Sequence, residues 1–332
     1  MSDSRIGFGT ADLGNLRTAM SDDDAWAILE AAWDSGIRYF DTAPHYGLGL
    51  SERRLGEFLR TKPRSAFTVS TKVGRLLRPH PHPTERDTEG FDVPGDLTRV
   101  WDFSPDGINR SVHESLERLG LDRVDLLLLH DPERYDLERG LASAVPAMTA
   151  LRDEGTVSMI GVGSMGTQAL LAASRTPGID ALMIAGRFTL ADQSVVPEVL
   201  NSCVVHAVDI VNASVFNSGL LATNNPESHA RFDYEEAPES VVRRVVRIRD
   251  ICREHGVDLP TAALHFAARG PRTRSVLIAG RRAEQVLQSM ERIRSDVPEA
   301  LWTQLAEEGL IPAGLGSSGT GEICAGRNGE RQ

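Results

Sequence analysis

Short apolar runs alternate with segments of helical periodicity eight times along this chain. The apolar runs predict strands at 6–9, 39–41, 67–72, 124–130, 158–163, 181–185, 204–212 and 275–279. Helical spacing of apolar residues follows at 22–35, 51–60, 109–119, 142–154, 168–174, 195–201, 239–255 and 283–293. Strands that alternate with helices form parallel sheets, and eight such units close into a barrel. The pattern therefore predicts an α/β protein with a TIM (β/α)8 barrel.

An open, doubly wound parallel sheet is the alternative that the same alternation allows. Such a sheet, when it binds a dinucleotide, carries a glycine-rich phosphate loop directly after its first strand. Here Gly7 and Gly9 are not followed by the third glycine of that fingerprint. We therefore predict the closed barrel.

Two excursions and a tail interrupt the alternation. Residues 75–105 follow the third strand, carry four prolines before Gly95 and show little periodicity, which predicts an irregular loop over the barrel mouth. A second excursion, 217–238, follows the seventh strand. Both are loop insertions at the C-terminal face of the barrel. We see no domain boundary, and we predict a single barrel domain over 1–313 with a flexible, Gly- and Ser-rich tail over 314–332.

Charge and composition exclude several classes of protein. A net charge of −11 argues against binding to a nucleic-acid backbone. The N-terminus is polar and no apolar run reaches membrane-spanning length, so we expect neither a secretory signal nor a membrane partner. The three cysteines, Cys203, Cys252 and Cys324, are scattered and predict no disulfide framework and no metal site. We expect a cytoplasmic protein, and its oligomeric state stays open.

Lysine is rare in this chain and marks a candidate site. Only two of the 36 lysine and arginine residues are lysines, and one of them, Lys72, closes the third predicted strand. The pKa of a lysine can be tuned, whereas an arginine stays charged. Two neighbouring strands also end in polar residues, at Asp41, with Tyr46 just beyond, and at His130. Because barrel strands deliver their C-terminal ends to one active face, we predict that these four residues share a catalytic site.

The four residues suit hydride transfer that is coupled to proton transfer. A carbon that loses a hydride must also lose the proton of its hydroxyl group. Tyr46 can accept that proton as a general acid/base if the pKa of its phenol, about 10 in water, is lowered. The ammonium of Lys72, paired with Asp41, would favour the phenolate, and His130 would orient the substrate oxygen. Both residues could instead have structural roles. Asp41 could accept a hydrogen bond within a turn, and His130 could hydrogen-bond to the backbone of a loop.

From about Arg5 to Pro312 the chain resembles the aldo-keto reductases. Five segments carry the resemblance together: 40–47, 51–56, 70–74, 124–132 and 160–163. Segments 185–190 and 298–310 are similar to the aldose 1-dehydrogenase branch. The resemblance implies an NAD(P)-dependent enzyme that oxidises the C1 hemiacetal of a sugar, an aldose of the L-fucose or D-arabinose class, to the lactone. A broad carbonyl reductase of aldehydes, a pyridoxal 4-dehydrogenase-like enzyme and a non-enzymatic nucleotide-binding subunit are the alternatives.

The resemblance also implies that NAD(P) lies across the barrel mouth. Ser164 falls where the family offers a Ser-Asn pair to the nicotinamide carboxamide; the next residue is Met165, and Arg187 is the other candidate partner. Residues 212–221 correspond to the loop that supports ribose and pyrophosphate, with Phe216 as the candidate stacking ring. The cofactor-binding residues that we predict are Gly9, Thr10, Ser164, Arg187, Ser214, Phe216, Ser218, Gly280, Arg281, Arg282 and Gln285.

The segment that follows the eighth strand bears on the choice between NAD and NADP. Gly280 to Gln285 opens a helix, and a helix N-terminus is an anion site. Arg281 or Arg282 could clamp a 2′-phosphate, which would favour NADP, or both could be solvated. In the first excursion, Trp101 and Phe103 could close over a sugar ring or could pack the loop onto the barrel.

Overall fold

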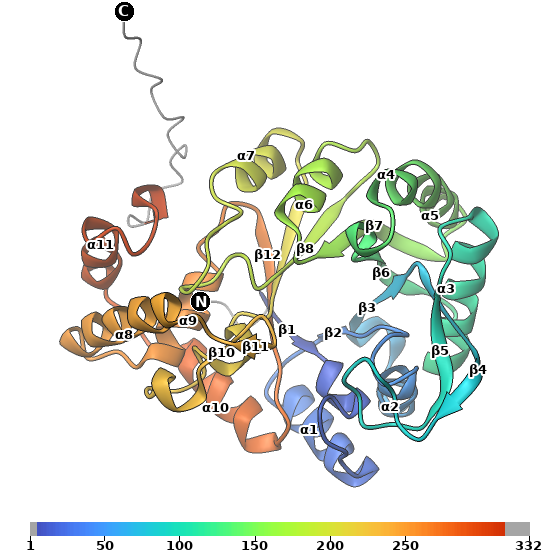
Figure 1. The fold of residues 1–332 in the computed structure, drawn as a ribbon, viewed down its shortest axis with the longest axis horizontal. Helices are drawn as coiled ribbons and strands as arrows, with labels where there is room; N and C mark the ends of the chain where they lie inside the picture. The colour runs from blue at the N-terminus through green and yellow to red at the C-terminus, as the bar shows by residue number, and fades with distance from the viewer. Residues whose placement is uncertain (1–4, 316–332) are drawn as a thin grey trace, which may run out of the picture.

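A computed structural model describes residues 5–315 of the chain. The predicted flexible tail therefore lies almost wholly outside the described residues. Eight parallel strands close into a barrel in the order β1-β12-β9-β8-β7-β6-β3-β2, which confirms the predicted TIM barrel (Figure 1). In chain order they are β1 (Ile6–Gly9), β2 (Tyr39–Asp41), β3 (Thr68–Val73), β6 (Val124–His130), β7 (Val157–Ser164), β8 (Ala181–Ala185), β9 (Asp209–Ala213) and β12 (Thr273–Ile278).

Helices surround the strands (Figure 1). They are α1 (Asp22–Asp34), α2 (Leu50–Leu59), α3 (Pro105–Leu119), α4 (Leu137–Arg139), α5 (Val145–Asp153), α6 (Thr167–Ser174), α7 (Glu198–Val205), α8 (Glu239–Glu254), α9 (Leu259–Ala267), α10 (Ala283–Arg294) and α11 (Glu299–Glu307). Helix α3 shows both local signals that define a helix. Ser104 caps its N-terminus by accepting from the Gly107 N–H, and Gly120 ends it at a φ of 64°.

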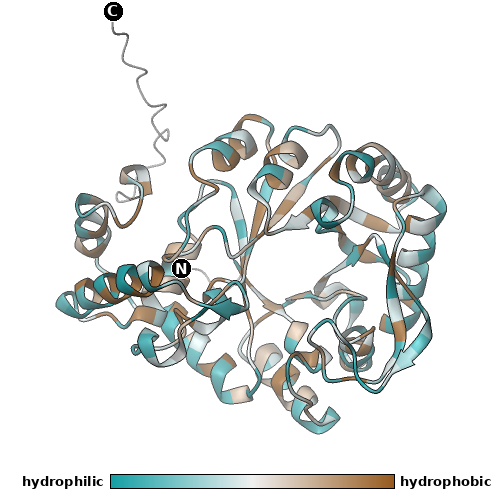
Figure 2. Ribbon diagram, in the orientation of Figure 1, coloured by the Kyte–Doolittle hydropathy of each residue, from teal (hydrophilic) through white to brown (hydrophobic). Residues whose placement is uncertain are grey.

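The barrel wall is apolar on both faces. Leu127 and Leu129 point outward into the large core beneath the helices, whereas Leu126 and Leu128 point into the barrel interior. Successive residues of a strand alternate between faces, so a strand buried on both faces reads as a continuous apolar run. Burying one such side chain stabilises the fold by roughly 1.5–3 kcal/mol. Figure 2 shows brown strands at the centre and teal on helices such as α8.

The structure corrects the predicted seventh unit. The predicted strand 204–212 begins too early, because Val204 and Val205 still belong to α7 and β9 begins at Asp209. An apolar pair at the end of a helix cannot be distinguished from the start of a strand by hydropathy alone. The sequence analysis also did not predict α9. This helix is buried around most of its circumference, so it lacks the polar face that reveals an amphipathic helix.

The first excursion is a β-hairpin, and the prediction of an irregular loop was wrong. β4 (Arg75–Thr84) pairs antiparallel with β5 (Gly95–Trp101) beside α3. The prolines of β4 suggested a loop, but every second backbone N–H in a two-stranded ribbon points away from the partner strand, and proline is tolerated at such positions. The segment that connects β4 to β5 contacts the segment after β1, where Phe91 forms an antiparallel bridge with Leu16. Among residues 5–315, no helix has the length and apolar character needed to cross a bilayer.

Candidate active site

Lys72, near the end of β3, contacts two acidic side chains, the carboxylate of Asp41 and the phenol of Tyr46. The Lys72 ammonium donates to Asp41 Oδ2 at 2.7 Å and to the Tyr46 hydroxyl at 3.1 Å. A third bond, 2.9 Å long, goes to the Thr42 carbonyl oxygen, so all three ammonium protons are used. Asp41 ends β2, Lys72 lies near the end of β3, and Tyr46 stands in the turn after β2. The structure thus brings together three of the four predicted catalytic residues by direct contact.

The carboxylate of Asp41 is itself held in place. Ser70 donates to Asp41 Oδ1 at 2.7 Å, and the Tyr39 hydroxyl lies 3.0 Å from the Ser70 oxygen. The Thr10 hydroxyl donates to the Asp41 carbonyl oxygen and also contacts Ser51. Thr10 therefore supports the end of β2 in this structure. The predicted contact of Thr10 with the cofactor stays a prediction.

His130 ends β6 and joins the same cluster through its ring. Its ring centroid lies 6.0 Å from that of Tyr46 and 5.6 Å from that of His45. Burial lowers the pKa of His130 well below its ordinary value, and the positive charges of Arg75 and Lys72 lower it further. His130 is therefore neutral at neutral pH. In that form it can donate one hydrogen bond to a substrate oxygen.

The electrostatics of Tyr46 differ from the expectation. Burial raises the pKa of the Tyr46 phenol to about 12, because the attraction of Lys72 offsets only part of the desolvation and Asp41 adds repulsion. For Lys72 burial lowers the pKa, but the Asp41 carboxylate and the Tyr46 oxygen more than offset this, and the pKa lies above its usual value. The expected lowering of the Tyr46 pKa was wrong for this structure. At neutral pH the pair is a phenol beside an ammonium.

A second buried ion pair lies next to His130 and was missed by the sequence analysis. Arg75 donates to Asp131 Oδ2 at 2.5 Å, and the same oxygen lies 3.7 Å from His130 Nε2. The Arg75 guanidinium stands 4.3 Å from the centre of the Trp101 ring, and Tyr135 stacks on that ring. Asp131 directly follows a predicted catalytic residue, which was a usable signal. Arg75 offered none, because its position depends on the hairpin.

The two aromatic residues of the first excursion have different environments. Phe103 is fully buried and packs the excursion onto the barrel. Trp101 keeps part of its surface exposed beside Arg75. Only Trp101 can therefore face a substrate without a rearrangement.

The second excursion makes hydrogen bonds with the segments that follow β8 and β9. It contains β10 (Arg231–Phe232) and β11 (Glu235–Glu236), and its turn residue Asp233 forms two hydrogen bonds, of 3.0 and 2.7 Å, with Arg187. Arg187 also pairs with Asp192 and donates to the Met165 carbonyl oxygen. The guanidinium thus ties the excursion to β7 and β8. The predicted contact of Arg187 with the cofactor is not tested by this geometry.

The loop after β9 has the backbone of an anion site. Phe216, at φ −97° and ψ 6°, is followed by Asn217 and Ser218 at positive φ values of 43° and 58°. Successive right- and left-handed residues turn their N–H groups into one concavity, which binds anions. The side chains of Ser214 and Ser218 contact Tyr234, the first through its hydroxyl and the second through its N–H. The Asn217 and Gly219 N–H groups already donate to the Ser214 and Phe216 carbonyl oxygens, so only part of this backbone is available to a phosphate.

The end of β7 holds a polar cluster in place of the family's Ser-Asn pair. The Ser164 hydroxyl donates to Glu133 Oε1 and accepts from the Gly166 N–H. Glu133 Oε2 is buried, and within residues 5–315 it has no hydrogen-bond partner. A buried, unpaired carboxylate oxygen is costly, so a bound amide donor would relieve it.

The two arginines after β12 have different surroundings. The Arg281 guanidinium donates to the carbonyl oxygens of Leu16 and Thr18 and so holds the segment after β1. Arg282 is exposed, and Gln285 Oε1 accepts from the backbone N–H groups of both arginines. The guanidinium of Arg281 therefore makes structural hydrogen bonds. Arg282 is the better placed candidate to bind a 2′-phosphate.

The predicted glycines lie at strand ends. A Cβ added at Gly9 would meet only the Ile278 carbonyl oxygen, at 3.8 Å, whereas one at Gly280 would come within 3.2 Å of the Gln285 Cβ. Gly9 leaves room at the barrel mouth, and Gly280 allows the next helix to start close to the strand. Their contacts with a cofactor stay predictions.

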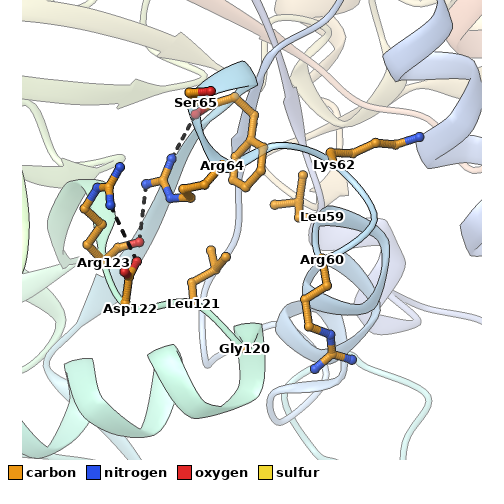
Figure 3. A pocket seen from close by; sticks show the side chains of 10 residues that line it. Leu59, Arg60, Lys62, Arg64, Ser65, Gly120, Leu121, Asp122 and Arg123 are labelled. Atoms are coloured by element: carbon orange, nitrogen blue, oxygen red, sulfur yellow. Dashed lines mark hydrogen bonds and ion pairs between the residues drawn. The ribbon is translucent and has the colours of Figure 1, made fainter.

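A surface pocket of about 680 Å³ lies at the opposite end of the barrel (Figure 3). Four cations surround it, namely Arg60, Lys62, Arg64 and Arg123. Residues 64–67 precede β3 and residues 120–123 precede β6, so the pocket faces the N-terminal ends of the strands. Active sites of such barrels lie at the C-terminal face. The pocket is therefore not part of the candidate active site.

Four polar residues from three strand ends now define a site at the C-terminal face of an eight-stranded barrel. The sequence model of the aldo/keto reductase family matches residues 5–307. The chain belongs to the aldo/keto reductase family. It is therefore an oxidoreductase of this family, as the resemblance implied.

Three relatives within the family cover most of the chain. A D-threo-aldose 1-dehydrogenase from Pseudomonas sp. is 55% identical over 310 residues, which is 92% of this chain and 94% of that protein. A pyridoxal 4-dehydrogenase from Microbacterium luteolum is 39% identical over 326 residues, which is 92% of this chain and 94% of that protein. An L-galactose dehydrogenase from Arabidopsis thaliana is 30% identical over 297 residues, with coverage of 87% and 84%.

Two solved structures share the fold of this chain. An aldo-keto reductase from Bacillus halodurans, in its holo form, superposes with a TM-score of 0.71 at 23% identity and covers 93% of this chain and 92% of that chain. A glycerol dehydrogenase from Gluconobacter oxydans superposes with a TM-score of 0.70 at 20% identity and covers 93% of each chain. At such identities the likeness concerns the fold alone.

The first prediction concerns the buried pair of Lys72 and Asp41. Asp41→Asn leaves the ammonium buried without its carboxylate, and breaking such a pair costs about 3–5 kcal/mol. We expect that loss in the free energy of unfolding, measured by urea denaturation at neutral pH. The double variant Asp41→Asn/Lys72→Met removes both charges and should recover part of the loss. If single and double variants were equally destabilised, the charge would not be the cause.

Proposed function

We propose that this protein is an NAD(P)-dependent aldose 1-dehydrogenase that oxidises the C1 hemiacetal of a sugar of the L-fucose or D-arabinose class to the lactone. The observation that carries the proposal is the Lys72 ammonium, which bridges Asp41 Oδ2 and the Tyr46 hydroxyl at 2.7 and 3.1 Å. The 55% identity to a D-threo-aldose 1-dehydrogenase supports the choice of substrate class.

The four candidate catalytic residues have different roles in moving a proton at the substrate oxygen. A bound nicotinamide would supply the acceptor for the hydride that leaves C1. Tyr46 in its phenolate form accepts the proton of the C1 hydroxyl, and the C1–O bond becomes the lactone carbonyl. Lys72 stabilises the phenolate by hydrogen bonding, and Asp41 keeps Lys72 in place. Neutral His130 donates to the substrate oxygen and orients it.

The residues at the barrel mouth fit a nicotinamide dinucleotide. The unpaired Glu133 Oε2 beside Ser164 is an acceptor suited to the amide N–H of a carboxamide. The concave backbone at 216–218 suits a pyrophosphate. Exposed Arg282, at the start of α10, suits a further phosphate.

A pyridoxal 4-dehydrogenase-like activity is the second candidate. The 39% identity to such an enzyme over 92% of the chain favours it. The stacked rings of Trp101 and Tyr135 at the rim could also hold a flat aromatic substrate. The two activities differ in the substrate that reduces NAD(P)⁺ fastest.

The second prediction tests the proposed function directly. The protein should reduce NAD⁺ or NADP⁺ with L-fucose and D-arabinose faster than with pyridoxal, and the lactone should be the product. Tyr46→Phe keeps the ring but removes the acidic oxygen, so turnover should fall by roughly a hundredfold to ten-thousandfold. Cofactor binding, followed by protein fluorescence, should survive. Near-normal turnover in Tyr46→Phe would show that another group moves the proton.

The third prediction concerns pH. Because the pKa of Tyr46 is raised to about 12, the phenolate that oxidation needs is scarce at neutral pH and increases with pH. The kcat/KM for sugar oxidation should therefore rise by up to about tenfold per pH unit through the alkaline range. Carbonyl reduction, which needs the phenol, should stay level there. No histidine step is expected near pH 6.5, because the pKa values of His45 and His130 are both lowered. A flat oxidation profile would contradict this assignment.

The fourth prediction separates the two arginines after β12. Arg282→Ala should raise the KM for NADP by roughly ten- to a hundredfold, as expected for a lost charge-assisted bond of about 1.5–3 kcal/mol, and should spare NAD. Arg281→Ala frees the segment at Leu16 and Thr18, so it should affect both cofactors alike. Steady-state kinetics with both cofactors measure this. Equal small effects of Arg282→Ala on NAD and NADP would identify Arg282 as a solvated surface residue.

A further inference from the structure

We propose that Asp131, held in place by Arg75, recognises a hydroxyl group on the carbon next to the reacting carbon and so selects hydroxylated substrates. The proposal rests on the proposed function, because it assumes that the substrate oxygen lies at Tyr46 and His130. It adds the residue that distinguishes a sugar from an unsubstituted aldehyde.

The position of Asp131 places a carboxylate beside the reaction centre. Asp131 follows His130 at the end of β6 and adopts a positive φ of 43°, while its N–H donates to the Gly163 carbonyl oxygen at 2.8 Å. Its Oδ2 atom lies 3.7 Å from His130 Nε2. Two polar groups at that spacing can contact oxygens on neighbouring carbons of one substrate. If His130 binds the oxygen on C1, Asp131 is positioned for the hydroxyl on C2.

Arg75 fixes the carboxylate and is itself fixed by the hairpin. Its side chain is only 3% exposed, and it donates to Asp131 Oδ2 at 2.5 Å. Arg75 and Trp101 are the paired residues at the base of the β4–β5 hairpin, and the guanidinium lies against the Trp101 ring. A buried guanidinium remains charged and needs a carboxylate partner. The hairpin therefore holds the Asp131 side chain in one orientation.

The carboxylate keeps capacity for a ligand. The Asp131 side chain is 18% exposed, and its contacts with Arg75 and His130 both use the Oδ2 atom, which leaves Oδ1 for a ligand. An ionised carboxylate only accepts hydrogen bonds, so it pairs with a hydroxyl donor. A substrate without that hydroxyl would cover the oxygen and leave it unpaired, which disfavours binding. The Asp131 carboxylate therefore favours a substrate that carries this hydroxyl over one that lacks it.

The experiment compares an aldose with its 2-deoxy analogue in the wild-type protein and in three variants. The wild type should show a kcat/KM ratio of roughly ten- to a hundredfold in favour of the aldose, as expected for one hydrogen bond to a charged group. Asp131→Asn keeps the shape but loses the charge, and the ratio should fall to within a few-fold of one. Arg75→Met/Asp131→Asn also removes the buried cation, so it guards against a folding defect and should show the same low ratio.

Asp125→Asn is the matched control. Asp125 lies at the other end of the same strand and pairs with Arg64 at 2.8 Å, so its loss removes a similar ion pair far from the mouth. The ratio should stay at the wild-type value in this variant. Equal losses of kcat/KM for the aldose and its 2-deoxy analogue in Asp131→Asn would overturn the proposal and assign the pair a purely structural role.

A second substrate pair separates this proposal from the proposed function. If the wild type oxidises no aldose with either cofactor, the proposed function fails, and the same ratio is then measured for the reduction of glyceraldehyde against propanal. Those substrates differ in the hydroxyl groups beyond the carbonyl carbon. A wild-type preference for glyceraldehyde that Asp131→Asn abolishes would support the role of Asp131 alone. No such preference, or no turnover of either aldehyde, would overturn it.

Discussion

The buried ion pair of Lys72 and Asp41 is the interaction on which the candidate site depends. A charge away from water is tolerated only with a partner, so the last residue of β2 and the end of β3 must stay in register. The same ammonium reaches Tyr46, which ties the turn after β2 to the barrel. Ser70 and Thr10 complete the support from β3 and from the segment after β1. The site is therefore assembled by neighbouring strands.

Around this centre, ion pairs formed by arginine attach the inserted segments to the barrel. Arg75 connects the first hairpin to Asp131, and Arg187 connects the second excursion to the barrel through Asp233. Arg281 holds the segment after β1. A guanidinium can bind several oxygens at once and stays charged, which suits such anchoring. Lys72, one of two lysines in the chain, stands where a compact charge must contact a carboxylate, a carbonyl and a phenol together.

Much of the fold could be predicted from the sequence, because each strand–helix unit has a local signal. The predicted elements were wrong where the local sequence pattern and the three-dimensional surroundings of a segment indicate different structures. Val204 and Val205 look like a strand but end a helix, and α9 is buried too completely to show a polar face. The four candidate catalytic residues could be selected from the sequence because each stands at or just after a strand end. Arg75 was not, since only the pairing of β4 with β5 brings it to Asp131.

The sequence by itself determined the barrel, the family and the identity of the polar residues at the strand ends. Hydropathy periodicity and residue type are local properties, and they suffice for those conclusions. Only the tertiary structure decided which charges meet and how strongly water is excluded from them. For that reason it raised the pKa of Tyr46 to about 12 where the residues alone suggested a lowering, and it bound Arg281 to the fold. Desolvation and pairing depend on neighbours that are distant in the chain.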